Sequence, residues 1–170
     1  MKVLSLVQKR IWSLLEQVPD PEVPVLSVID LGIVRDVQLY TTPDGNGGVE
    51  VIITPTYTGC PAMDMISANI KMELLSNGFQ HVKITSVLAP AWTTDWMTEQ
   101  GKQKLKEYGI APPNPKQQVC REDLFADESV QCPHCNSYHT HRISEFGSTA
   151  CKALYQCDEC KEPFDYFKCH

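Results

Sequence analysis

The chain has 170 residues, of which 42% are apolar, and its formal net charge is −6. A chain of this length forms one medium domain or an ordinary domain with a small appendage, and its acidic balance argues against nucleic acid as a partner because acidic surfaces repel phosphate groups. No apolar run approaches the roughly 20 residues that cross a bilayer and the charged start is unlike a signal peptide, so we expect a cytoplasmic protein without a membrane partner.

The first 110 residues predict a small α+β domain. Alternating apolar residues indicate strands, apolar residues at helical spacing indicate helices, and a glycine-rich turn at residues 44–48 joins the first two strands as a hairpin. The expected elements, in chain order, are a helix at 1–18, strands at 33–40 and 49–56, a helix at 61–77, a strand at 81–88 and a helix at 94–108. This α-β-β-α-β-α order favours helices packed on one face of a three-stranded sheet.

The second predicted helix is apolar on more than one side. Met65, Met72 and Leu75 widen its main stripe, which consists of Met63, Ile66, Ile70 and Leu74. We therefore expect this helix to be buried on more than one side. Methionine and tryptophan side chains that stay exposed near the helices would instead favour a homodimer.

A proline-rich stretch opens a predicted linker at residues 111–128, which separates the first domain, at 1–110, from a tail at 129–170. Seven of the eight cysteines lie in this linker and tail. In a cytosolic protein such clustering indicates metal or redox chemistry rather than disulfides. Strands predicted at 140–146 and 153–156 would form a β-ribbon in the tail.

Two Cys-x-x-Cys pairs stand in the tail, Cys132 with Cys135 and Cys157 with Cys160. A tight turn aims the two sulfurs of each pair at one point, so the two turns supply the four thiolates that tetrahedral zinc prefers. A zinc β-ribbon with a structural metal is the leading interpretation. An iron–sulfur cluster and unrelated buried thiols remain as alternatives at this stage.

Cys151 lies outside the two pairs. It follows a glycine and two small hydroxyl residues, which favour a bend that presents the thiol, and the neighbouring Lys152 would favour its thiolate form. A buried, unreactive small side chain explains the residue equally well.

The one early cysteine, Cys60, follows a predicted strand and precedes a predicted helix. Backbone N–H groups of the first helical turn would stabilise a thiolate there, and Thr58 would donate a hydrogen bond to the sulfur. The sheet order would bring Asp20 to the same edge, where its carboxylate would exchange a proton with Cys60 or share a metal with it. The alternative is a capping cysteine in a turn-forming loop.

Residues 20–22, 30–32 and 58–61 carry a family resemblance. With these segments the first domain resembles the cytosolic iron–sulfur assembly factors typified by SufT. The resemblance implies that Cys60 is functional and that a transient iron–sulfur cluster is handled there.

The whole chain is similar to the PaaD family of phenylacetate-degradation proteins. The segments that carry this similarity are residues 20–26, 54–62, 90–97, 146–157 and 162–167. The similarity implies association with phenylacetyl-CoA epoxidase, a multicomponent monooxygenase that forms a ring 1,2-epoxide with electrons from an iron–sulfur reductase. The chain has neither the Glu-x-x-His pairs of a di-iron site nor a glycine-rich dinucleotide motif, so we expect it to assist this enzyme rather than to catalyse the reaction itself.

The leading hypothesis is therefore a maturation protein. Cys60, with Asp20, would handle iron or a cluster in transit, and the zinc ribbon would dock the client, for which we expect the reductase component. Two alternatives stay open: a structural subunit of the monooxygenase, and a thiol-redox protein that uses Cys60 or Cys151.

Overall fold

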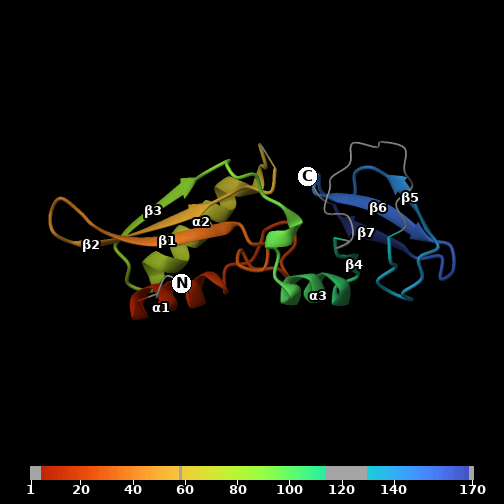
Figure 1. Ribbon diagram of the computed structural model, residues 1–170, viewed down its shortest axis with the longest axis horizontal. Helices are drawn as coiled ribbons and strands as arrows, with labels where there is room; N and C mark the ends of the chain where they lie inside the picture. The colour runs from red at the N-terminus through yellow and green to blue at the C-terminus, as the bar shows by residue number, and fades with distance from the viewer. Residues whose placement is uncertain (1–4, 58, 114–129, 169–170) are drawn as a thin grey trace. The chain divides into compact units, whose positions relative to one another are not determined.

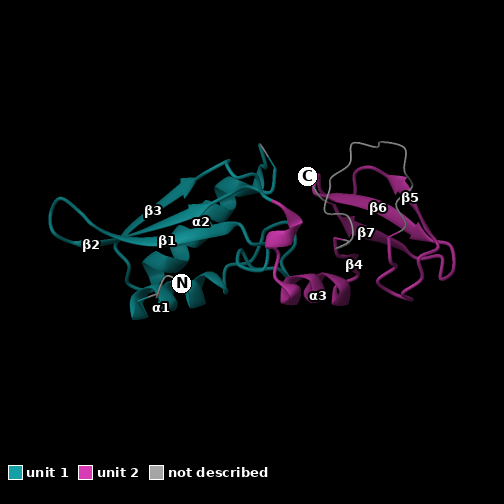
Figure 2. Cartoon of the chain, viewed as in Figure 1, with its two compact units in different colours: residues 1–92 teal, residues 93–170 magenta. Residues whose placement is uncertain are grey.

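The computed structural model describes residues 5–57, 59–113 and 130–168. The chain forms two compact units, Met1–Trp92 and Thr93–His170 (Figure 2). Both combine helices with a small sheet, so the predicted α+β class is confirmed. None of the helices in this described part of the chain is both long and apolar enough to span a bilayer.

The first unit has the predicted order of elements, with bounds that differ by a few residues. Its elements are α1 (Leu6–Leu15), β1 (Val34–Thr41), β2 (Gly47–Ile53), α2 (Ala62–Ser76) and β3 (His81–Ser86). β2 is the central strand, antiparallel to β1 and parallel to β3, and α2 makes the crossover between the parallel pair. Both helices lie on one side of the sheet (Figure 1). The helices therefore cover one face, as expected.

The core of the first unit lies between the sheet and its two helices. β2 turns Val49, Val51 and Ile53 inward in strict alternation. The helices contribute their own apolar stripes to this layer: Ile11, Leu14 and Leu15 from α1, and Ile66, Ile70 and Leu74 from α2. This packing fixes α2 against the sheet.

The outer side of α2 differs from the prediction. Met65, Met72 and Leu75 are 55%, 64% and 43% exposed, so the helix is buried on one side only. The three residues lie opposite the buried stripe around the helix, and a three-stranded sheet offers a helix only one surface to pack against. The expectation of burial on several sides is therefore wrong.

The second unit contains more of the chain than the predicted tail. Its elements are a 3₁₀ turn (Thr94–Trp96), α3 (Glu99–Glu107), β4 (Ile110–Ala111), β5 (Thr140–Ser144), β6 (Lys152–Cys157) and β7 (Pro163–Phe167). The four strands form one sheet in the order β4-β7-β6-β5.

The division expected at residue 110 differs from the observed one. β4 pairs in parallel with β7, Ile110 opposite Asp165 and Ala111 opposite Tyr166, so the start of the predicted linker at 111–128 is part of the sheet. Leu105 of α3 is fully buried, and α3 belongs to the second unit. Residues 114–128 of the predicted linker lie outside the described residues.

Candidate metal centre and thiol sites

The structure brings together the four cysteines of the two Cys-x-x-Cys pairs. Their sulfur atoms all lie within 4.8 Å of one another. The Sγ atoms of Cys132 and Cys160 are 3.7 Å apart, and those of Cys135 and Cys157 are 3.5 Å apart. Zinc in tetrahedral coordination, with Zn–S bonds of about 2.3 Å, requires sulfurs about 3.8 Å apart. The four residues therefore fit a tetrahedral metal ion, and the protein has a metal-binding site here.

The two cysteine turns have the same backbone geometry. In the first turn the N–H of Cys132 donates to the carbonyl of Ser137, and in the second the N–H of Cys157 donates to that of Glu162, at 2.8 and 3.1 Å. The residue after each turn has a left-handed backbone conformation, with φ of 63° at Asn136 and 65° at Lys161. Two like turns facing each other place four sulfurs at the corners of one tetrahedron.

The thiols of the second turn differ in acidity because of the groups around them. The backbone N–H of Cys160, opposed by burial, lowers the pKa of Cys157 to about 7. The N–H of Glu162 acts likewise on Cys160, but burial and the neighbouring sulfurs raise the pKa of Cys160 to about 12. Without a cation the four thiols do not all ionise, because like charges so close repel one another. A divalent ion supplies the opposite charge that stabilises all four thiolates.

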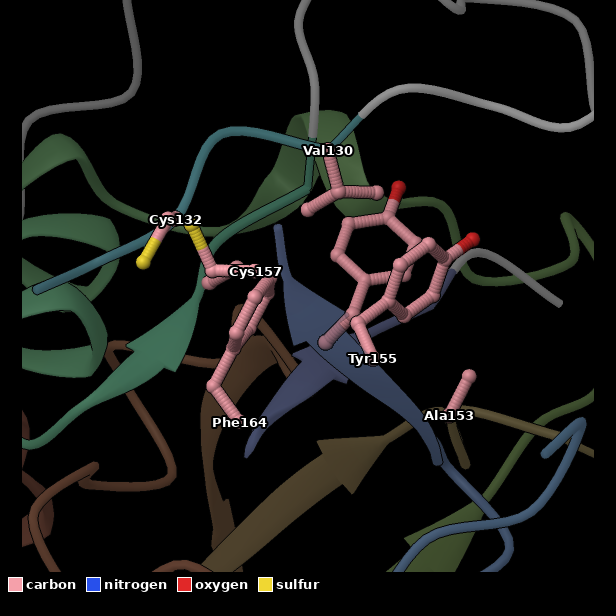
Figure 3. Packing of buried hydrophobic residues seen from close by; sticks show 8 residues of the cluster. Val130, Cys132, Ala153, Tyr155, Cys157 and Phe164 are labelled. Atoms are coloured by element: carbon pink, nitrogen blue, oxygen red, sulfur yellow. The ribbon is translucent and has the colours of Figure 1, made fainter. Parts of the chain in front are cut away.

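One side of the metal site rests on the core of the second unit. Cys132 and Cys157 are fully buried and belong to an apolar cluster with Val130, Tyr155 and Phe164 (Figure 3). Cys135 is exposed and Cys160 half-buried. The metal site therefore anchors the cluster on its inner side and faces solvent on its outer side.

Cys60 lies apart from these thiols, in the loop between β2 and α2. It is half-buried, and its carbonyl accepts a hydrogen bond from the N–H of Met63 at 3.3 Å. Gly59, at φ +82°, makes the turn before it. The N-cap is Pro61, one residue later than predicted, so Cys60 directly precedes the first turn of α2. Thr58, its predicted hydrogen-bond donor, lies outside the described residues.

Asp20 holds the turn that follows α1. Its Oδ1 accepts hydrogen bonds from the backbone N–H groups of Glu22 and Val23, at 2.9 and 2.7 Å, and the residue is buried. This arrangement is an Asx-type turn, which the prolines around it stiffen. Asp20 therefore shapes this loop, and its predicted partnership with Cys60 stays a prediction.

Cys151 is buried, and its sulfur lies 3.0 Å from the hydroxyl of Thr149. Lys152, its predicted activator, points elsewhere, because neighbouring residues of a strand alternate between faces: its Nζ lies 3.3 Å from Asp165. The residue paired with Cys151 is Lys168, whose N–H donates to the Cys151 carbonyl. Burial lowers the pKa of Lys168. Sequence reasoning missed this lysine because it is brought to Cys151 by pairing between strands.

Comparison with known proteins assigns each unit to a class. Residues 8–85 match the family described as "Iron-sulfur cluster assembly protein", and residues 116–168 match the "PaaD zinc beta ribbon domain". A solved structure of a domain of unknown function from Bacillus anthracis is similar to this chain, with a TM-score of 0.51 at 26% identity, and the match covers 58% of this chain and 90% of that domain. The protein thus joins an iron–sulfur assembly domain to a zinc β-ribbon.

Two curated relatives narrow this class. One, from Escherichia coli K12, is named as a putative subunit of 1,2-phenylacetyl-CoA epoxidase and is 54% identical over 94% of this chain and 91% of its own length. The other, an Fe–S protein maturation auxiliary factor from Porphyromonas gingivalis, is 35% identical over 58% of this chain and 90% of its own. The chain belongs to the PaaD family of epoxidase subunits, and the predicted resemblance is confirmed.

Proposed function

We propose that this protein is an accessory factor of phenylacetyl-CoA epoxidase that assists assembly of the iron–sulfur centre in the reductase component. Support comes from the E. coli relative, named as an epoxidase subunit, and from the P. gingivalis relative, named as a maturation factor. Together they favour this role over a purely structural subunit or a thiol-redox protein. We also propose that the factor acts in the cytoplasm.

The observation that carries the proposal is the position of Cys60. The residue is partly accessible, lies within the part that matches iron–sulfur assembly proteins, and directly precedes the first turn of α2. Within the described residues, the one group of three or more clustered metal ligands is the four-cysteine site. Cys60 therefore supplies a single ligand, which suits a cluster held in transit.

Transfer of the cluster is then an exchange of ligands. The Cys60 thiolate binds an iron of the cluster that is the cargo, and a client cysteine replaces it. The client thiol loses a proton and Cys60 gains one, so no electron is needed. Because one sulfur holds the cargo, a client that offers several thiolates competes successfully for it.

The second unit holds a structural zinc and docks the client. Its sulfur tetrahedron is complete without an open position, which is typical of structural rather than catalytic zinc. The metal fixes the two turns, and they in turn fix the sheet that presents the docking surface. Iron in the four-cysteine site would instead make this unit a cluster carrier.

The test uses Cys60→Ser in the full chain, produced together with the reductase component. We expect the purified reductase to contain several-fold less iron and acid-labile sulfide than with the wild-type protein, while zinc per chain of the variant stays unchanged. Cys151→Ser is the matched control and should support full loading. Wild-type loading of the reductase by Cys60→Ser would overturn the proposal.

A further inference from the structure

The outer face of α2 has an unusual arrangement of side chains. It consists of seven exposed residues, here called the Ala68 face: Pro61, Asp64, Met65, Ala68, Lys71, Met72 and Leu75. Met72 is 64% exposed, more than any other methionine among the described residues. Three large apolar side chains on one helical face exceed the scattered exposure that is usual for a surface.

Successive residues of an α-helix are 100° apart, so the positions on this face follow from the sequence numbers. Ala68 lies at the centre of the exposed side, directly opposite the buried stripe. Met65 and Met72 form one edge of the face, and Asp64 and Lys71 form the other. A small residue thus stands between an apolar edge and an edge that carries one charge of each sign.

We propose that the Ala68 face binds the same face of a second copy of this chain, with the two α2 helices antiparallel and a two-fold axis at Ala68. This symmetry places the methionine edge of one helix beside the methionine edge of the other, and the charged edge beside the charged edge, with the two helices running in opposite directions. Met65 then meets Met72 of the other copy, and Asp64 meets Lys71, each pair occurring twice. A residue that lies a given number of positions before Ala68 in one copy meets a residue about as many positions after Ala68 in the other. Pro61 and Leu75, each seven positions from Ala68, therefore also meet.

The charged residues of the face favour a second copy of this chain as the partner, and an antiparallel over a parallel arrangement of the two helices. Neither Asp64 nor Lys71 has an ion pair or hydrogen bond with another described residue, and the two lie two helical turns apart, too far to pair within one helix. The antiparallel arrangement pairs them with opposite charges and also aligns the helix dipoles favourably. A parallel two-fold arrangement would place the charged edge against the methionine edge, so that neither charge finds a partner.

The two-fold arrangement constrains the thiol chemistry. Cys60 lies eight residues before Ala68, so the two Cys60 residues of a pair are separated by roughly 24 Å along the helix axis. They do not ligate one cluster together. The pair therefore presents two independent Cys60 sites, one at each end. The inference concerns the α2 surface and does not rest on the maturation role.

A charge-reversal cycle on the full chain tests the pairing. A single helix pair is a small interface, so we expect sedimentation equilibrium from roughly 5 to 500 µM to show a reversible monomer–dimer transition. Asp64→Lys and Lys71→Glu each place like charges opposite one another and should weaken dimerisation about tenfold or more. The double variant recreates two opposite-charge pairs and should dimerise nearly as well as the wild type.

Lys9→Glu, on the exposed side of α1, changes the net charge as Lys71→Glu does and should leave dimerisation unchanged. Circular dichroism shows whether each variant stays folded, as surface changes should. A wild-type chain that stays monomeric at the highest concentration would overturn the proposal, as would a double variant that does not recover. A monomeric wild type whose Ala68-face variants fail to load the reductase would assign the face to the client, overturning the dimer but not the maturation role.

Discussion

The sulfur atoms of Cys135 and Cys157 lie 3.5 Å apart, although the residues are 22 positions apart in the chain and belong to different turns. Each turn is closed by the same kind of backbone hydrogen bond, from its first cysteine to the residue five positions later. The first turn precedes β5 and the second joins β6 to β7, so a metal ion bound by all four cysteines would link these two turns.

Loss of the metal should unfold the second unit and spare the first. Cys135 is exposed, so Cys135→Ser removes a ligand with little loss of packing. Structural zinc supplies on the order of 10 kcal/mol of folding free energy in small domains. We expect zinc below one ion per chain and loss of amide-exchange protection in β5, β6 and β7, with protection in β1, β2 and β3 unchanged.

The matched control for this change is Cys151→Ser, which alters a buried thiol outside the metal site and should keep the zinc. Chelation of the wild-type metal should reproduce the Cys135→Ser exchange pattern. Retained protection of β6 and β7 after complete zinc removal would show that the apolar cluster alone holds the unit.

Zinc binding should release protons. In the metal-free site the pKa of Cys160 is about 12, that of Cys135 is raised and that of Cys157 is about 7. At pH 7, binding therefore displaces a whole proton each from Cys160 and Cys135 and about half a proton from Cys157. A pH indicator in weakly buffered solution measures this release during titration of the metal-free chain with zinc.

The affinity for zinc should depend on pH because the thiols of the metal-free site bind protons. As pH falls through 7, Cys157 also becomes protonated in the metal-free chain, so more protons compete with zinc and its affinity falls more steeply. As pH rises from about 7 to about 8.5, the release from Cys157 should vanish while that from Cys160 remains. Constant release across this range would contradict the low pKa of Cys157.

Lys161→Gly should stabilise the second unit. Lys161 is left-handed, with φ of 65°, where a side chain is disfavoured by roughly 1 kcal/mol and glycine is not. The net gain should be about 0.5 kcal/mol, because glycine also increases the freedom of the unfolded chain. Thermal unfolding of the zinc-loaded protein measures it.

The control for the glycine effect is Lys106→Gly in α3, which removes a similar side chain from a helix and should destabilise by about 1 kcal/mol. Lys161→Val should also destabilise, since β-branched residues fit left-handed backbone poorly. Equal effects of glycine at residues 106 and 161 would show that backbone conformation does not govern the second position.

The metal ligands and the order of elements in the first unit could be predicted because they depend on local spacing. Two residues between cysteines define a turn whatever surrounds it, and a proline and a glycine mark the ends of α2. The cap was predicted one residue early, at Cys60 instead of Pro61, which is the usual uncertainty for a helix end.

Features that depend on distant contacts were missed. β4 has only two residues, too few for a periodic signal, and exists because β7 offers it a free edge. Lys152 was assigned to Cys151 as its neighbour in sequence, whereas strand alternation turns it toward Asp165 and pairing between strands brings Lys168 to Cys151. Neither the pairing of β4 with β7 nor the contact between Lys168 and Cys151 can be predicted from a local sequence pattern.

The sequence by itself determined the four-cysteine metal site, the α+β class and the family, because ligand spacing, hydrophobic periodicity and motif segments are local properties of the chain. Only the tertiary structure decided which apolar residues are buried. Met65 and Ile70 both belong to the apolar pattern from which burial was predicted, but Met65 faces solvent and Ile70 is fully buried. The physical reason is that burial depends on the number of packing surfaces around a helix, and the sheet of this unit provides one.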